Sequence, residues 1–488
     1  MSDSRLAGLV KAYDVRGIVP DQLDAEVARA LGAAFAEVIA QREDARAVVI
    51  GHDMRPSSPE LSRAFAEGVT ARGVDAILIG LCSTDGLYYA SGHLDVPGAM
   101  FTASHNPAQY NGIKLCRSGA RPVSSESGLV EIREIAERLL EGGPDGPVEV
   151  ASGADGADGA GTITEQDLLT GYATFLRGLV DLRGIRPLRV VVDAGNGMGG
   201  FTVPAVLGTG AGLEALPLTI EPLYFELDGT FPNHEANPLD PKNIVDLQAA
   251  VREHGADLGL AFDGDADRCF VVDERGAAVS ASAITALIAE REVAREVARG
   301  VPVGDVSIVH NVITSATVPE LLAALGARSV RTRVGHSYVK ADMAAADAVF
   351  GGEHSAHYYF RDFWFADTGM LAAMHVLAAL GEQDAPLSTL MAPYDKYPAS
   401  GEINSVVEDV AAATDRVRDW AREQGARTED FDGLGVEREG GPAGPRWWFS
   451  LRPSNTEPLL RLNVEADDEP TMTSVRDEVL SLVRGSGA

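Results

Sequence analysis

Cysteines and long apolar runs are scarce in this sequence. Its 488 residues include three cysteines, Cys82, Cys116 and Cys269, which are widely spaced and form no CxxC pair. They predict neither a disulfide framework nor a zinc site, and they fit a reducing cytoplasm. No apolar run reaches the roughly 18–20 residues of a membrane span, and the first residues carry charges where a signal peptide needs an apolar core. We therefore expect a cytoplasmic protein with no membrane partner.

Basic residues are also few compared with acidic ones. The sequence has 41 Lys and Arg against 72 Asp and Glu, a formal net charge of −31. Because nucleic-acid phosphates are bound by clustered Lys and Arg, we predict no nucleic-acid partner. Hydrophobic residues make up 45% and charged residues 23%, which is an ordinary globular composition.

Apolar runs alternate with helical patterns along most of the chain, as in α/β units around mostly parallel sheets. One pattern occurs three times: an apolar strand, a small-residue turn, a proline-started helix and a glycine stop. Its strands are expected at 47–51, 188–193 and 306–309. The last hundred residues instead predict strands at 404–410, 447–451 and 459–464, with helices at 411–423 and 473–483. We predict three related α/β domains with mixed sheets over 1–150, 162–278 and 279–392, a smaller α+β domain over 393–488, and a linker over 151–161.

Three carboxylates alternate with small residues in Asp263-Gly-Asp-Ala-Asp-Arg268. The segment lies between two apolar runs, which predicts a tight loop between strands. Asp263, Asp265 and Asp267 could surround one hard cation such as Mg²⁺, which prefers oxygen ligands. The loop has no His or Cys, so zinc is disfavoured. A solvated acidic turn is the alternative, whereas an EF-hand is disfavoured because Arg268 occupies the position that requires glycine.

A serine lies among small and polar residues in Thr102-Ala-Ser-His-Asn-Pro107. Ser104 could carry a phosphate or act as a nucleophile, with His105 and Lys114 as possible proton handlers. A capped turn before the proline is the alternative. The chain has no GxSxG motif, so a serine hydrolase of the α/β type has little support.

Two polar clusters and one glycine-rich turn complete the motifs. Gly352-Glu-His-Ser-Ala-His357 is suited to hydrogen bonds with sugar hydroxyls, and Arg452-Pro-Ser-Asn-Thr-Glu-Pro458 to a dianionic phosphate. A hydrogen-bonded turn explains either one alone equally well. The segment 195–200 matches GxGxxG, but Asp193 would repel a pyrophosphate there, so we interpret its glycines as permitting a tight turn.

Taken together, these motifs resemble the α-D-phosphohexomutase superfamily, most closely its phosphomannomutase/phosphoglucomutase branch. The resemblance begins at Tyr13-Asp-Val-Arg-Gly17, continues through the serine, aspartate and sugar motifs, and ends at the Arg452 motif. It spans nearly the whole chain and implies four domains around a central cleft. Two positions depart from the family pattern: Ala356 replaces a glycine, and Asn311-Val-Ile313 stands where a lysine is common.

The resemblance also implies residue roles. Glu353 and Ser355 would hold the O3 and O4 hydroxyls of a hexose, and Ser104 would carry a phosphoryl group. The implied catalytic residues are Ser104, Arg16, Lys114, Arg268 and His357; the implied substrate-binding residues are Tyr13, His336, Glu353, Ser355, Arg452, Ser454, Asn455 and Thr456; and the implied Mg²⁺ ligands are Asp263, Asp265, Asp267 and Ser104.

The function implied is a mutase that interconverts hexose 6-phosphates and hexose 1-phosphates through a phosphoserine. Mg²⁺ would be its cofactor and a hexose 1,6-bisphosphate its intermediate and activator. A phosphoglucosamine mutase, a Ser104-dependent metal phosphatase and a sugar-phosphate sensor are the alternatives. The expected partners are small hexose phosphates, and both a monomer and a homodimer remain open.

Overall fold

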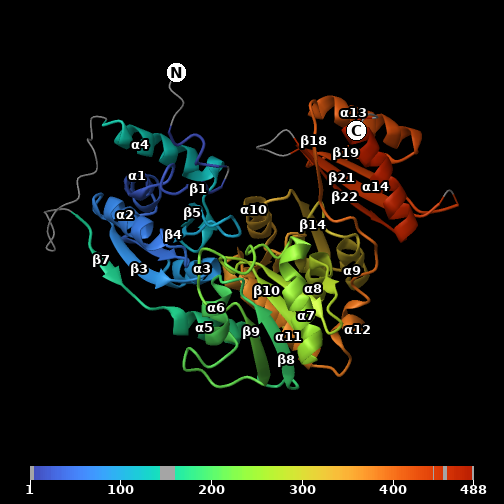
Figure 1. Cartoon of the computed structure of the whole chain (residues 1–488), viewed down its shortest axis with the longest axis horizontal. Coiled ribbons are helices and arrows are strands. Elements are labelled where there is room, and N and C mark those ends of the chain that lie inside the picture. The colour runs from blue at the N-terminus through green and yellow to red at the C-terminus, as the bar shows by residue number, and fades with distance from the viewer. Residues whose placement is uncertain (1–4, 12, 143–159, 443, 454–458, 486–488) are drawn as a thin grey trace. The chain divides into compact units, whose positions relative to one another are not determined.

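The computed structural model describes residues 5–11, 13–142, 160–442, 444–453 and 459–485 (Figure 1). Most of the predicted linker at 151–161 lies outside these residues. The chain divides into two compact units. The first comprises Met1–Val279, Met343–Phe350 and Ser355–Leu390, and the second comprises Ser280–Asp342, Gly351–His354 and Met391–Ala488.

The first sheet is mixed and has the strand order β1-β5-β4-β2-β3-β7, with β6 beside β5. Its centre is parallel, and β1, β5 and β6 pair antiparallel. Helices α1, α2 and α4 lie side by side (Figure 1). The backbones of α1 and α2 approach closely, since a Cβ at Gly32 would lie 2.1 Å from the carbonyl oxygen of Phe65. The elements are β1 (Val15–Ile18), α1 (Ala25–Phe35), β2 (Ala47–His52), α2 (Ser58–Thr70), β3 (Asp75–Leu81), α3 (Thr84–Leu94), β4 (Gly98–Phe101), β5 (Tyr110–Arg117), β6 (Arg121–Pro122), α4 (Val130–Leu140) and β7 (Ile163–Glu165).

The second sheet, of order β12-β11-β10-β8-β9, is also mixed. Its strand β8 coincides with the predicted strand 188–193, but the expected proline-started helix is wrong here. Helix α6 begins at Gly199, with Pro204 inside it, because Gly195 (φ 52°) and Asn196 (φ 59°) already turn the chain. The elements are α5 (Leu169–Leu179), β8 (Leu188–Asp193), α6 (Gly199–Val206), β9 (Leu218–Leu223), α7 (Val245–His254), β10 (Leu258–Phe262), β11 (Cys269–Asp273) and β12 (Ala278–Val279).

The third sheet has the order β14-β13-β15-β16-β17, with parallel β13 and β14 and antiparallel β16 and β17. Helix α11 is buried along its whole length, which fits a sequence that is apolar on all sides apart from His375. The elements are α8 (Ala281–Ala298), β13 (Ser307–Asn311), α9 (Thr317–Leu325), β14 (Arg328–Thr332), α10 (His336–Ala346), β15 (Phe350–Gly352), β16 (Tyr358–Phe360), β17 (Ala366–Asp367), α11 (Gly369–Gly381) and α12 (Leu387–Met391).

The fourth sheet is antiparallel and has the order β18-β22-β21-β20-β19, with α13 and α14 packed together beside it. The predicted strand 404–410 is too long, because the side chain of Asp409 accepts a hydrogen bond from Ala412 N and caps α13. The elements are β18 (Ile403–Val406), α13 (Val410–Glu423), β19 (Arg427–Asp430), β20 (Leu434–Arg438), β21 (Trp447–Pro453), β22 (Leu459–Ala466) and α14 (Glu469–Arg484). The mixed and antiparallel sheets confirm the predicted fold class.

Strand β7 lies in the predicted second domain but belongs to the first sheet. It pairs in parallel with β3, so residues 163–165 extend the first sheet before the chain enters the second. Our predicted second span, 162–278, therefore begins with a strand of the first sheet. Contacts with the first unit continue on both sides of β7, since Gly161 N donates to the carbonyl oxygen of Thr70, the last residue of α2 (2.9 Å), and Gln166 N to that of Leu78 in β3 (3.0 Å).

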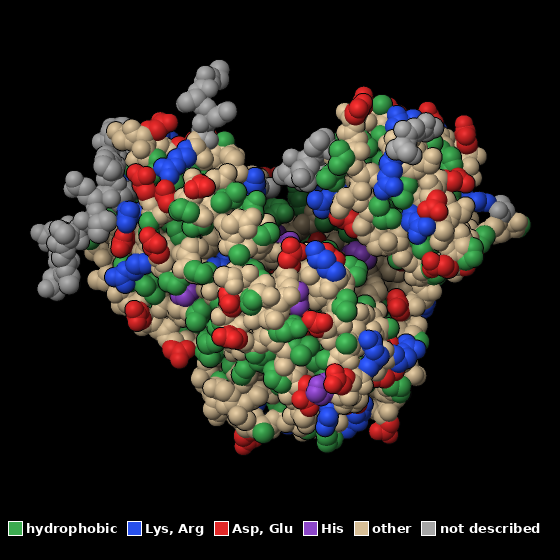
Figure 2. All heavy atoms as spheres, in the orientation of Figure 1, with side chains coloured by type: hydrophobic (Ala, Val, Ile, Leu, Met, Phe, Trp, Pro, Cys, Tyr) green, Lys and Arg blue, Asp and Glu red, His purple; other side chains and the backbone are tan. Residues whose placement is uncertain are grey.

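None of the helices in the described part of the chain is long and apolar enough to cross a membrane. Figure 2 shows acidic and basic side chains interspersed over the face in view. On that face, the excess of acidic residues is spread rather than gathered into one patch.

Asp85, in the first turn of α3, is fully buried and joins three elements of the first unit. It accepts hydrogen bonds from Tyr172 Oη (2.8 Å), Thr368 Oγ1 (2.6 Å) and Ser83 Oγ. Burial raises the pKa of this carboxyl to about 6, against an ordinary value of 3.8. Since the folded state binds the proton more tightly than the unfolded state, stability falls as the pH rises through this interval.

We therefore expect pH to change the stability difference between Asp85→Asn and the unmutated protein. From pH 5 to pH 8 the unmutated protein should lose about 1.4 kcal/mol relative to the variant, since one pKa unit corresponds to about 1.36 kcal/mol. Urea unfolding at both pH values measures this difference. Asp347→Asn, at a side chain that is 79% exposed, is the control. Parallel stability profiles for Asp85→Asn and the unmutated protein would contradict the assignment.

Candidate active site

The Ser104 loop connects β4 to β5, and a buried arginine holds its backbone. The guanidinium of Arg55 donates to four carbonyl oxygens of this loop and also bonds the buried carboxylate of Asp53. Ser104 has a left-handed φ of 49°, which is strained for a residue other than glycine. The Arg55 clamp therefore fixes the serine in an unusual conformation before any ligand binds. The four carbonyls belong to Ser104 (3.0 Å), Asn106 (2.7 Å), Pro107 (3.0 Å) and Tyr110 (2.9 Å).

The carboxylate loop 263–268 closes the antiparallel pair β10–β11, as the sequence predicts. Gly264 allows it to approach the serine, because a Cβ there would lie 2.3 Å from the carbonyl oxygen of Ser104. Gly197, in the GxGxxG segment, packs against Gly264 on the other side, where a Cβ would lie 2.6 Å from the Gly264 carbonyl oxygen. These glycines thus permit close packing of three loops. Across this contact, Ser104 Oγ donates a hydrogen bond to Asp263 Oδ2 at 2.8 Å.

Two cations neutralise the three aspartates. Lys114 Nζ lies 2.7 Å from Asp265 Oδ2 and 2.6 Å from Asp267 Oδ2, and Arg268 Nη2 lies 2.9 Å from Asp263 Oδ2. Burial opposes the charge on Lys114, but the charges of Asp265 and Asp267 raise its pKa well above the usual value. Lys114 therefore carries a positive charge rather than exchanging a proton.

The pKa values of Asp263 and Asp265 are shifted in opposite directions because the partners of the two carboxylates differ. Burial raises the pKa of Asp263 to about 7, despite the opposing charge of Arg268. Burial would also raise the pKa of Asp265, but Lys114 and a 2.6 Å hydrogen bond from Thr84 Oγ1 keep it below the usual value. Of Asp263 and Asp265, Asp265 is therefore the more firmly ionised.

The aspartate triad fits a hard cation. One oxygen from each of Asp263, Asp265 and Asp267 lies within 4.8 Å of the others, and all three side chains are buried. Asp265 Oδ1 and Asp267 Oδ1 accept no hydrogen bond from the part of the chain that the structure describes. Buried carboxylate oxygens normally have partners, so these two are available as ligands. The all-oxygen donor set is the kind that Mg²⁺ prefers.

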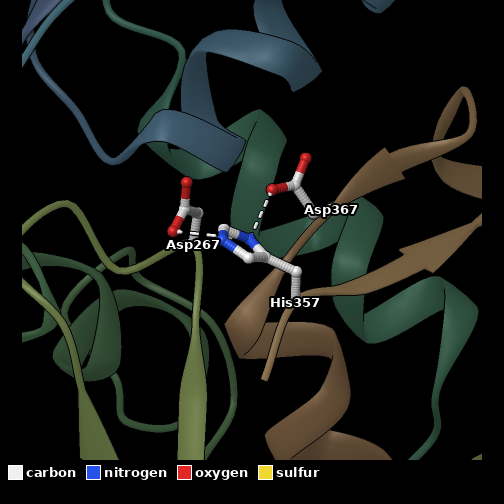
Figure 3. A group of neighbouring side chains, drawn as sticks. All are labelled: Asp267, His357 and Asp367. Carbon is white, nitrogen blue, oxygen red and sulfur yellow. Dashed lines mark hydrogen bonds and ion pairs between the residues drawn. The ribbon is translucent and has the colours of Figure 1, made fainter. Parts of the chain in front are cut away.

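His357 and Asp367 lie beside Asp267 of the triad (Figure 3). His357 Nδ1 lies 2.9 Å from Asp367 Oδ2 and 3.9 Å from Asp267 Oδ1. Burial lowers the pKa of His357, but the charge of Asp267 and the hydrogen bond to Asp367 outweigh it and raise the pKa above 6.5. With Nδ1 directed at Asp367, Nε2 is the atom that can exchange a proton with a bound molecule.

His105 differs from His357 because a cation faces it. Its Nδ1 lies 2.6 Å from Arg268 Nη2 and 3.2 Å from Ser104 Oγ. Burial and the charge of Arg268 lower the pKa of His105 well below 6.5, so the imidazole is neutral. It accepts a hydrogen bond from Arg268, which orients that guanidinium beside the serine.

Arg16 and Tyr13 complete the expected residues at the first sheet. Arg16 donates to the carbonyl oxygen of Ala103 (3.2 Å) and to Asn106 Oδ1, and it pairs with Asp14 at 2.6 Å. It therefore adds positive charge beside the serine loop. Tyr13 is 40% exposed.

The second unit carries the expected sugar-binding carboxylate, Glu353, which is 1% exposed. Its Oε1 accepts hydrogen bonds from Asn311 Nδ2 and from Gly335 N, each at 3.1 Å. Asn311 stands in the segment where the family commonly has a lysine, and here it orients Glu353 instead of adding charge. His336 follows Gly335 directly, at the start of α10.

The loop between β15 and β16 contains Ser355, which is half-buried, and Ala356. Ala356 is fully buried and adopts a left-handed φ of 65°. A glycine, as in the family pattern, would adopt this backbone conformation with less strain than Ala356, by about 1 kcal/mol.

Arg452 lies at the end of β21, opposite Arg461 of β22. Their guanidinium groups flank Glu402 at 3.5 Å and 3.4 Å, and Arg452 also lies 3.7 Å from Asp432. The buried Nε atoms of both arginines lack a hydrogen-bond acceptor among the described residues, so two donors are available to an anion. Three expected residues, Ser454, Asn455 and Thr456, lie outside the described residues.

Sequence reasoning missed several supporting residues, namely Arg55, Thr84 and Asp367 in the first unit and Asp432 in the second, and it noted Asn311 only as a departure from the family pattern. Asp432 links two loops of the second unit, since its Oδ2 accepts from Val334 N at 3.0 Å and it pairs with Arg452. Asp367 had a visible signal, because it directly precedes Thr368, the cap of the apolar helix α11. The others act through backbone atoms or distant contacts that no local pattern reveals.

Comparisons with known proteins agree with this geometry. Family models of phosphoglucomutase/phosphomannomutase match domain I at residues 7–141, domain II at 170–276, domain III at 281–397 and the C-terminal domain at 402–482. The chain is 38% identical to phosphohexose mutases of Xanthomonas campestris pv. campestris, over 97% of this chain and 99% of theirs. It is 36% identical to a phosphomannomutase of Escherichia coli, over 97% and 98%.

Solved structures give the same result. A phosphoglucomutase/phosphomannomutase family protein from Burkholderia thailandensis is 28% identical, with a TM-score of 0.82 over 99% of this chain and 98% of that one. The resemblance predicted from the motifs is therefore confirmed. The chain belongs to the phosphoglucomutase/phosphomannomutase family and is an enzyme of the isomerase class, an intramolecular phosphotransferase.

Proposed function

We propose that this enzyme interconverts the 6-phosphates and 1-phosphates of mannose and glucose through a phosphorylated Ser104 and a hexose 1,6-bisphosphate. One observation carries the proposal: Ser104 Oγ lies 2.8 Å from Asp263 in a buried all-oxygen triad, on a backbone clamped by Arg55. Phosphoryl transfer depends mainly on positioning and charge neutralisation, and both are prepared here.

The residues that would hold Mg²⁺ are Asp263, Asp265 and Asp267, with an oxygen on Ser104. When bound, the ion would supply positive charge to offset that of the phosphoryl group. Arg268 and Lys114 lie against the same aspartates and add fixed positive charge, and Arg16 contacts the serine loop. These cations stabilise the charge that builds up as the phosphoryl group moves.

His357 is the proposed proton carrier. Asp367 holds Nδ1, which leaves Nε2 to take the proton from the attacking sugar hydroxyl and to return it in the second half of the cycle. In the first half, phosphoserine 104 gives its phosphoryl group to the free hydroxyl of a hexose phosphate. After the bisphosphate has turned over, its other phosphate returns to Ser104.

The sugar is assigned to Glu353 and Ser355, and the phosphate that is not transferred is assigned to Arg452. Glu353, oriented by Asn311 and the Gly335 amide, would accept hydrogen bonds from the O3 and O4 hydroxyls, together with Ser355. Arg452 would bind the phosphate that is not transferred, and the expected Ser454, Asn455 and Thr456 would join it.

Phosphorus NMR of mannose 1-phosphate with the protein, Mg²⁺ and a trace of hexose bisphosphate tests the proposal. We expect the 6-phosphate to appear with little release of inorganic phosphate. Steady phosphate release would instead indicate a phosphatase. A parallel reaction with glucosamine 1-phosphate separates the mutase alternatives, since faster conversion of that sugar would contradict the preference proposed here.

Arg452→Ala should raise KM for hexose phosphates by about 10- to 150-fold, because a hydrogen bond to a charged group contributes about 1.5–3 kcal/mol. The change in kcat should be small, since the phosphate that Arg452 binds is not the one transferred. Steady-state kinetics measures both constants, and Arg183→Ala, at a 73% exposed side chain, is the control. A large fall in kcat at unchanged KM would place Arg452 in the transfer step instead.

Glu353→Ala should reduce kcat/KM for glucose and mannose phosphates by similar factors. The two sugars differ only at C2, whereas Glu353 is assigned to O3 and O4, so the same hydroxyls lose their partner in both complexes. Galactose phosphates, which differ at C4, should be poor substrates of the unmutated enzyme. If Glu353→Ala impaired mannose turnover and spared glucose turnover, the hydroxyl assignment would be wrong.

A further inference from the structure

His357, Asp267 and Asp367 converge in a way that proton transfer alone does not require. Figure 3 shows the imidazole between the two carboxylates, and one ligand atom from each residue lies within 4.8 Å of the others. His357 Nδ1 is 2.9 Å from Asp367 Oδ2 and 3.9 Å from Asp267 Oδ1. In a tetrahedral zinc site with bonds of about 2.0–2.1 Å, neighbouring ligand atoms lie about 3.3 Å apart. The two observed distances fall on either side of that value, so small side-chain rotations would bring both to it.

The three ligands are held by the fold. Asp267 belongs to the tight β10–β11 loop, Asp367 to β17, and His357 directly precedes β16, which pairs antiparallel with β17. An antiparallel bridge between Arg268 and His357 connects the aspartate loop to the residue before β16. Both carboxylates are at most 2% exposed. A cation would therefore enter a prepared cluster rather than gather mobile side chains.

A second observation points to a cation at this place. The two oxygens of Asp267 have different surroundings. Oδ2 bonds Lys114, whereas the buried Oδ1 accepts no hydrogen bond from the described residues and faces His357, with Arg268 Nε 4.0 Å away. A buried carboxylate oxygen without a donor is unfavourable by about 1–3 kcal/mol or more. A metal ion bound to Oδ1 would supply the missing partner.

The donor set distinguishes this cluster from the aspartate triad. Imidazole nitrogen is a good ligand for Zn²⁺ and similar transition ions, whereas Mg²⁺ prefers oxygen. Asp267 is common to both groups and would bridge them.

We propose that Asp267, His357 and Asp367 form a second cation site, selective for Zn²⁺ and related transition ions over Mg²⁺, and that its occupation inhibits the enzyme. Binding replaces the proton on His357 Nδ1, which leaves to solvent, and a water completes the tetrahedron. The inhibitory effect rests on the proposed function, because it assumes that His357 carries the proton during phosphoryl transfer. The binding itself does not rest on it.

Calorimetric titration of the full-length protein with ZnCl₂ in a large excess of MgCl₂ tests the binding. We expect one Zn²⁺ per chain in the presence of Mg²⁺. Asp367→Asn should weaken this binding by more than tenfold, and His357→Gln should do the same. Asp265→Asn, which alters the magnesium triad but none of the three proposed zinc ligands, and Asp347→Asn, at an exposed carboxylate, should leave it within about threefold. Circular dichroism and melting temperature confirm that each variant is folded.

The outcomes separate the two proposals. Zn²⁺ binding that Mg²⁺ abolishes, or that survives both Asp367→Asn and His357→Gln, would overturn the second site. Co²⁺, used as a coloured substitute, should give the intense visible absorption of a tetrahedral nitrogen–oxygen site in the unmutated protein and lose it in Asp367→Asn. Zn²⁺ binding without hexose phosphate conversion would contradict the proposed function and leave the site intact. Inhibition that rising Mg²⁺ relieves completely would overturn the inhibitory role.

Discussion

Ser104→Ala should lower mutase turnover by more than about 10⁴-fold, the scale observed when an enzyme loses its nucleophile. The expectation follows from the position of Ser104 Oγ, which lies 2.8 Å from Asp263 and 3.2 Å from His105 Nδ1. No other hydroxyl is described within hydrogen-bond distance of Asp263. The fold should survive the change, because Arg55 holds the loop through the serine's carbonyl oxygen and not its side chain.

Intact-mass measurement and peptide mapping provide a second readout. The protein incubated with glucose 1,6-bisphosphate should gain one phosphate, located at Ser104, and Ser104→Ala should gain none. Ser125→Ala, at an exposed serine outside this loop, should behave like the unmutated protein in both mass and turnover. Full activity in Ser104→Ala, or a phosphate mapped to another serine, would refute the phosphoserine mechanism.

The aspartate loop was predictable from sequence because its residues are consecutive in the chain. Three carboxylates between two apolar runs can form only a short loop, and the structure places residues 263–268 in the turn of the β10–β11 pair. The contact between Asp263 and Ser104 spans 159 residues, and no periodicity encodes it. Its determinant is Gly264, whose missing Cβ leaves room for the serine's carbonyl oxygen. Only the family resemblance linked the two motifs in advance.

The supporting residues were not predictable, because their partners are backbone atoms or lie far away in sequence. Arg55 reads as an ordinary surface arginine between two turns, yet it is 1% exposed and holds four carbonyls of the serine loop. Thr84 looks like a helix-start residue, but its hydroxyl bonds Asp265, 181 residues later. Strand β7 was missed for a related reason: three residues with mostly exposed side chains give no apolar signal, and main-chain pairing with β3 defines the strand.

The errors in the predicted element boundaries also have physical causes. Apolar and polar residues continue through 404–410 without a break, so the sequence predicts one strand. The carboxylate of Asp409 instead accepts a hydrogen bond from Ala412 N, which ends the strand and caps the start of α13. At 199–206, the turn is made by two left-handed residues before the helix, so its start does not need the proline.

Asp265→Ala should reduce kcat by at least about 10³-fold, or about 4 kcal/mol, and change KM by only a few fold. The surroundings keep the pKa of Asp265 below its usual value, and its buried Oδ1 has no hydrogen-bond donor among the described residues. Removing it takes one of three ligands from the triad while the groups assigned to the sugar stay unchanged. The loss should therefore appear in the transfer step.

Two further variants separate metal binding from general support of the loop. Thr84→Val removes the 2.6 Å hydrogen bond to Asp265 but keeps the carboxylate, so its effect should be smaller, about 10- to 100-fold, as for other partners of metal ligands. Asp347→Ala, at an exposed carboxylate, should have no effect. The Mg²⁺ concentration that gives half-maximal rate should rise most in Asp265→Ala, less in Thr84→Val and not in Asp347→Ala. If instead the unmutated enzyme kept its full rate in EDTA without added Mg²⁺, the triad would be a charge-paired structural loop, in which Lys114 and Arg268 balance the aspartates permanently.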